Sequence, residues 1–248
     1  MMPLIRDNAI VLGRLDYSET SQVLVLFARD HGKVRAIAKG IKRGTKTRFA
    51  TGIDLLEVGS VVLSIRHERQ EGLATITEWK QTRSLSGLRE KLFRLHGAQY
   101  LSEVTAQLIE DWDPHPALFN ALIDTLALLG GANEPLDATV RFQVSLLTSI
   151  GAMPRTDTCM TCGGSDDLIF FSSFEGGLLC KHCEASHVEK REISPGVLAA
   201  LRRATDDQEI SGYLEAVFSL LNYHISHLMG RHPKLAQKLV PLARQRRV

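Results

Sequence analysis

The four cysteines of this 248-residue chain occur as two closely spaced pairs. They are Cys159 and Cys162, then Cys180 and Cys183, so the spacing is Cys-x2-Cys-x17-Cys-x2-Cys. This spacing is typical of a four-thiolate zinc site, because each pair can place two sulfurs on one ion. Four protein ligands leave no open coordination position. The sequence therefore predicts one structural, non-catalytic Zn²⁺ per chain.

Two other chemistries stay open for these thiols, namely redox exchange and an iron–sulfur cluster. Redox Cys-x-x-Cys pairs usually open a helix within an α/β unit, and no such unit is visible in the sequence. The neighbouring His182 and His187 could each replace one cysteine, but four cysteines already complete a tetrahedron, so we expect both rings to be solvated. His224 and His227 are three residues apart with no carboxylate beside them in the sequence, and we expect ordinary surface or core histidines.

A second group of chemistry-bearing residues is a basic run in the N-terminal third. Between Arg29 and Arg48 there are eight lysines and arginines and one acidic residue, Asp30. Residues 39–48 also contain two glycines and no apolar periodicity, which predicts a loop rather than a packed element. A loop with this charge density attracts a phosphate backbone, although a solvated connector is the alternative. The predicted nucleic-acid-binding residues are Arg35, Lys39, Lys42, Arg43, Lys46 and Arg48.

Aromatic residues near this run are candidate stacking platforms for bases, namely Phe27, Phe49 and Trp79, but core packing is the favoured interpretation for each. Residues 40–47 also approach the phosphate-binding pattern G-x4-G-K-[ST]. The match fails because Thr45 replaces the second glycine and the residues that follow are a poor helix start. A phosphate-using enzyme is thus the weaker alternative, and we predict a protein without catalytic residues.

Composition limits the class of protein. With 44% hydrophobic residues and a formal net charge of +2, the chain is expected to fold as an ordinary globular protein. No stretch approaches the roughly 18 apolar residues of a membrane span, so no membrane partner is predicted. Arg6 and Asp7 interrupt the one N-terminal apolar stretch, which argues against a secretory leader. The expected location is the cytoplasm.

The pattern of apolar residues predicts a multi-domain α+β chain. Residues 1–80 contain about five short strands with turns between them, as in a small β-barrel or sandwich. Helical periodicity follows, with helices expected from Ser86 to about Glu110, from Leu118 to Leu129 and after Asp137. The cysteine module, residues 156–192, interrupts them, and its hairpin at 168–179 would return the second pair to the first. Further helices are expected after Ser194, up to Gly230, and at 235–244. The helical domain is therefore predicted as residues 81–155 and 193–248, with the later helices packed on the earlier ones.

At this point the residues resemble the RecO family of DNA repair proteins. The resemblance rests on Arg6 with Ala9–Leu12, on Tyr17-Ser18-Glu19, on Val23–Phe27 with Gly32, and on Ala38-Lys39-Gly40 with its basic tail. It continues through the helical region, the cysteine pairs after Gly151 and Ser194-Pro195-Gly196. It covers essentially the whole chain.

The resemblance implies more than the spacing does. RecO-like proteins have an N-terminal OB-fold and a helical domain, here with an inserted zinc-ribbon-like module, and some members lack the four cysteines. They are non-enzymatic mediators that bind and anneal single- and double-stranded DNA, associate with RecR and with the tail of single-strand-binding protein, and help RecA to load. This implies a nucleoid-associated protein whose DNA contacts include the basic residues named above. An RNA-binding protein is the alternative, since a barrel and a zinc module would serve RNA equally well.

Overall fold

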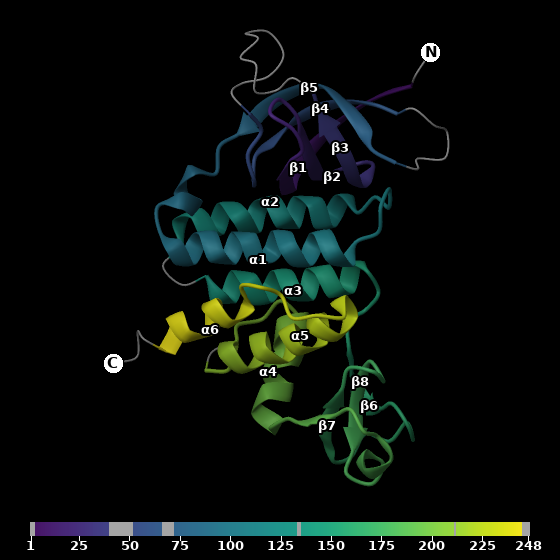
Figure 1. Ribbon diagram of the computed structural model, residues 1–248. Coiled ribbons are helices and arrows are strands. Elements are labelled where there is room, and N and C mark those ends of the chain that lie inside the picture. Colours follow the sequence, from purple (N-terminus) through teal and green to yellow (C-terminus); the bar gives the residue numbers. More distant parts are fainter. Residues whose placement is uncertain (1–2, 40–51, 66–71, 133–134, 211, 245–248) are drawn as a thin grey trace. The chain divides into compact units, whose positions relative to one another are not determined.

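The computed structural model describes residues 3–39, 52–65, 72–132, 135–210 and 212–244 (Figure 1). The chain forms two compact units, residues 1–132 and 133–248. Within the described residues, no helix is long and apolar enough to cross a lipid bilayer.

The first unit opens with a closed five-stranded barrel. Its strands are β1 (Leu4–Asp16), β2 (Gln22–Ala28), β3 (Gly32–Ala38), β4 (Val58–Ser64) and β5 (Ala74–Arg83). The strand order is β1-β2-β3-β5-β4, closed by the pairing of β1 with β4. Every pair is antiparallel except β3 with β5. This topology is that of an OB-fold, so the predicted fold class is confirmed.

Alternation along β2 and β3 separates the barrel core from its outer face. Leu24 and Leu26 on β2, with Val34 and Ala36 on β3, are completely buried and belong to one apolar cluster inside the barrel. The residues between them point outward because side chains alternate across a strand. Phe27 and Trp79 pack in the core, which was the favoured interpretation for these aromatic residues. Phe27 is buried edge-on against Phe119 with 5.6 Å between ring centroids, and the Trp79 indole donates to Glu57. Phe49 lies outside the described residues.

Helices follow the barrel within the first unit. They are the 3-10 turn η2 (Ser86–Arg89), α1 (Leu92–Leu108) and α2 (Pro116–Gly131). The prediction of one helix capped by Ser86 is wrong at its start, since α1 begins after Lys91. The prolines at 114 and 116 separate α1 from α2 as expected, and Pro116 opens α2, where a missing backbone N–H does no harm.

Arg94 on α1 is a buried cation that joins these helices. Its side chain is 7% exposed, and its guanidinium donates to the carbonyl oxygens of Gly130, Gly131 and Ala132 at the C-terminal end of α2. It also donates to the carbonyl oxygen of Gly87 in η2. A cation at this end satisfies carbonyls that have no partner within the helix. Glu90 provides an ion pair at 3.1 Å.

We therefore expect Arg94→Met to destabilise the first unit by about 3 kcal/mol, because it leaves several carbonyls without donors. Urea unfolding measures the change. Arg89→Met is the matched control, since Arg89 is half exposed and its ion pair with Asp54 is worth less than about 1 kcal/mol. Equal losses in the two variants would contradict the assigned role.

In its described residues, the second unit combines four helices with a small sheet. Its elements are α3 (Leu136–Ser149), β6 (Arg155–Cys159), β7 (Leu168–Ser172), β8 (Gly177–Cys180), the 3-10 turn η3 (Glu184–Ser186), β9 (Arg191–Glu192), α4 (Pro195–Thr205), α5 (Leu214–Met229) and α6 (Ala236–Arg244). The sheet order is β6-β8-β7-β9, and α3 packs against α4 and α5.

Local signals at the helix ends of this unit are mostly as expected. The Ser194 hydroxyl accepts the Val197 N–H and caps α4, and Gly230 ends α5 in the left-handed conformation. Asp137 is one residue inside α3 rather than at its cap. The division between residues 132 and 133 groups α1 and α2 with the barrel, whereas α3 packs with the later helices. The domain boundaries at residues 80, 155 and 192 stay predictions.

Candidate metal centre and nucleic-acid interface

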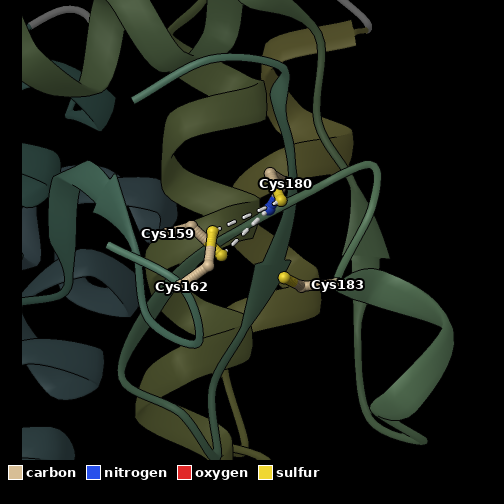
Figure 2. A group of neighbouring side chains, drawn as sticks. All are labelled: Cys159, Cys162, Cys180 and Cys183. Atoms are coloured by element: carbon tan, nitrogen blue, oxygen red, sulfur yellow. Dashed lines mark hydrogen bonds between the residues drawn. The ribbon is translucent and has the colours of Figure 1, made fainter. Parts of the chain in front are cut away.

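The strands of the small sheet bring the four cysteines together. Strands β6 and β8 are parallel neighbours, and Cys159 and Cys180 are their last residues. Because parallel strands end at the same edge of a sheet, the two cysteine pairs meet there. Cys162 and Cys183 lie in the turns that follow, which are closed by the N–H of Gly163 to the Cys159 carbonyl and of Cys183 to the Cys180 carbonyl. Figure 2 shows the four side chains converging.

The sulfur positions fit one metal ion. All four Sγ atoms lie within 4.8 Å of one another, and those of Cys162 and Cys180 are 3.9 Å apart. Tetrahedral Zn–S bonds of about 2.3 Å require sulfur separations of about 3.8 Å. A disulfide would need about 2 Å, and all four thiols are free. The cluster can therefore hold a metal ion, with soft ligands that suit zinc or iron.

Electrostatics at the cluster favours a cation. Burial opposes ionisation of Cys159, but N–H groups of Cys162, Cys180 and Thr161 aimed at its sulfur lower the thiol pKa to about 6. Hydrogen bonds to neighbouring sulfurs, first that of Cys180, together with burial, raise the pKa of Cys183 to about 12. Four thiolates at these separations would repel one another, so full ionisation needs a positive ion between them.

Two histidines near the cluster have structural partners. His187 was expected to be solvated, but its side chain is only 17% exposed, and its two ring nitrogens contact Thr161 Oγ1 at 2.8 Å and Glu175 Oε1 at 3.1 Å. That expectation is wrong. The ring instead ties the first cysteine turn to the β7–β8 hairpin. His182 is exposed, as expected.

The other histidine pair fixes the cysteine module to α5. His224 is buried, its Nε2 faces the Ala152 carbonyl at 2.9 Å, and its Nδ1 faces the Ser173 hydroxyl at 2.8 Å. Burial lowers the pKa of His224, and both nitrogens are engaged, which leaves none for a metal. His227 does have a carboxylate nearby, Glu189 at 3.9 Å, which the sequence did not reveal because the two are 38 positions apart.

The second candidate site is the outer face of the barrel. Arg35 lies outward on β3 with its side chain 60% exposed, and Lys39 follows the same strand on the surface. Arg35 pairs with Asp111 at 3.5 Å, whereas no ion pair of Lys39 is found among the described residues. Four of the predicted residues, Lys42, Arg43, Lys46 and Arg48, lie outside the part of the chain that the structure describes, as does the rejected phosphate-loop pattern.

Sequence reasoning missed an apolar row beside these cations. Strand register places Leu15 on β1, Val23 on β2 and Ile37 on β3 directly across from one another. Leu15 is 65% exposed, and Tyr17, just beyond β1, is 68% exposed. The strand 2–3 face and the loop after strand 1 are where OB-folds bind oligonucleotides, and exposed apolar and aromatic side chains can stack on bases.

A barrel of OB-fold topology, followed by helices and a four-cysteine cluster, places the chain among modular α+β proteins of the OB-fold class. Within that class, the chain matches both models of the family described as Recombination protein O. The N-terminal model matches residues 1–85, and the C-terminal model matches residues 89–235. The chain belongs to the RecO family of DNA repair proteins.

Curated relatives agree with this assignment. A protein of Rhodopirellula baltica is 32% identical over 206 residues, which cover 82% of this chain and 75% of the relative. Proteins of Halalkalibacterium halodurans and Bacillus subtilis are 31% and 29% identical, over 79% and 80% of this chain and 76% of each relative. All three are named DNA repair protein RecO.

Proposed function

We propose that this protein is a non-enzymatic recombination mediator that binds single- and double-stranded DNA, anneals complementary strands and helps a recombinase to load on DNA coated by single-strand-binding protein. The observation that carries the proposal is the closed OB-fold barrel whose β2–β3 face exposes Arg35 and leads through Lys39 into the basic run. The DNA-binding residues proposed are Arg35, Lys39, Lys42, Arg43, Lys46 and Arg48.

The barrel face combines the two contacts that a single strand needs. Cations on and after β3 attract phosphates, while Leu15, Val23, Ile37 and Tyr17 offer apolar surface to unpaired bases. Annealing requires two strands to approach despite their charge. A dense group of cations lowers that repulsion, which supports annealing as the activity of this face.

Family membership supports the remaining parts of the proposal. The proposed protein partners are RecR, the C-terminal tail of single-strand-binding protein and, indirectly, RecA, and the proposed location is the cytoplasm at the nucleoid. The ion proposed for Cys159, Cys162, Cys180 and Cys183 is a single Zn²⁺. With four protein ligands it would stabilise the module and take no part in a reaction.

Titration of a fluorescent single-stranded oligonucleotide at several salt concentrations tests the DNA-binding proposal. With about five phosphates engaged, the slope of log affinity against log salt should lie between about −3 and −4. A slope near zero would contradict it. Competition by RNA of matched sequence decides between DNA and RNA, because only contacts to the 2′-hydroxyl separate them. Stronger binding of the RNA would favour the alternative function.

A further inference from the structure

The linker between α1 and α2 lies against β3, the strand that carries the candidate DNA-binding cation. The Trp112 N–H donates to the Lys33 carbonyl at 2.9 Å, and Lys33 and Asp111 form a parallel β-bridge. Among the described residues, β5 pairs with β3 at Ala36–Ala38. The linker thus pairs with the first half of β3, where β5 does not.

Backbone packing fixes this linker in place. Gly32 adopts a φ of +72°, and a Cβ there would lie 2.1 Å from the Asp113 carbonyl oxygen, so only glycine allows the close approach. Trp112 adopts a left-handed φ of +63° and packs its indole against the barrel core. The position of Asp111 is therefore set by its neighbours and not by its own charge.

The Asp111 carboxylate faces two cations of β3 that differ in exposure. Its Oδ1 lies 3.1 Å from Lys33 Nζ, and Lys33 is nearly buried and also donates to the carbonyls of Ala106 and Ile109. Its Oδ2 lies 3.5 Å from Arg35 Nε, and both of these side chains are substantially exposed, at 43% and 60%. Lys33 is thus a structural cation, whereas Arg35 is open to a second anion.

We infer that Asp111 is a built-in competitor of the nucleic-acid phosphate at Arg35 and thereby sets the affinity of the barrel face. The inference rests on the proposed function. A phosphate that binds Arg35 must displace the Asp111 carboxylate or share the guanidinium with it. The net gain in binding free energy from that contact is therefore smaller than for an unpaired cation. An exposed ion pair is weak enough for such exchange. A protein that anneals strands has to release the product, and an internal anion at the binding face makes release easier.

Asp111→Asn removes the negative charge but keeps an oxygen that can accept from Lys33. We expect it to bind a fluorescent oligothymidylate about fivefold more tightly at 0.1 M salt, with a salt slope steeper by about 0.7, because one more phosphate contact releases a counterion. Glu110→Gln is the matched control, since it makes the same charge change one residue away. In an Arg35→Gln background, the effect of Asp111→Asn should vanish.

A second measurement does not depend on the linker variant. Arg35→Gln should weaken binding less than Lys39→Gln, since the Arg35 contact is offset by Asp111. The inference is overturned if Asp111→Asn binds like wild type, if Glu110→Gln has an equal effect, or if Arg35→Gln costs as much as Lys39→Gln. A wild-type chain that binds no oligonucleotide would overturn the proposed function itself, and the inference with it.

Discussion

Charge reversal at Lys39, Lys42, Arg43 and Lys46 to glutamate is expected to abolish binding of a fluorescent single-stranded oligonucleotide. The change removes four cations and adds four anions within eight residues. Phosphates would then be repelled where they are now attracted. The slope of log affinity against log salt should decrease in magnitude, from about −3.5 toward zero. Fluorescence anisotropy measures both the affinity and the slope.

The control for this variant reverses four exposed cations of the second unit, Arg203, Arg231, Lys234 and Lys238. Net charge changes equally in the two variants, so a difference in affinity reports the location of the charges. Retention of most of the affinity and slope is expected for the control. Equal losses would show that overall charge, and not the basic run, governs binding.

Replacement of Cys159 by serine is expected to abolish binding of the proposed zinc ion and to unfold the module of residues 156–192. Cys159 is 2% exposed and ends β6, so its loss removes a ligand at the buried side of the cluster. Zinc binding supplies on the order of 10 kcal/mol to the folding of small metal modules, which have little core of their own. Hydrogen exchange should show protection lost across this module.

Elemental analysis of the reduced protein should give one zinc per wild-type chain. His182→Ala is the control and should retain the metal, because His182 is exposed and the four sulfurs complete the site. Oligonucleotide affinity should be nearly unchanged by Cys159→Ser, since the proposed binding face belongs to the barrel. Wild-type protein without metal would refute the zinc assignment. Iron in the protein, together with visible absorbance, would instead indicate an iron–sulfur cluster at this site.

The features predicted correctly from sequence depend on residues close together in the chain. The Cys-x2-Cys turns and the hairpin between them follow from short spacings, and so do the cap at Ser194 and the stop at Gly230. The start of α1 was missed because it depends on a distant contact. A Cβ on Gly87 would lie 2.6 Å from the Gly130 carbonyl oxygen, and this packing favours a 3-10 turn where Ser86 suggested a helix cap.

The missed parts of the candidate sites have the same origin. Asp111 meets Arg35 across 76 positions of sequence, so charge counting along the basic run could not reveal the pair. The alternation of side chains along β1 places Leu15 on the outer face. Only the strand register shows that Leu15 lies beside Val23, and Val23 beside Ile37. The alternation of outward and inward side chains was the available signal in the sequence. It carries no information on which face of the barrel binds a ligand.

Both tryptophans of the chain, Trp79 and Trp112, belong to the first unit, one inside the barrel and one on the linker that packs against it. Indole emission is therefore an intrinsic optical probe of that unit alone, whereas circular dichroism averages over every helix and strand. Denaturation followed by both methods would resolve whether the two units melt together or in succession, without any added label.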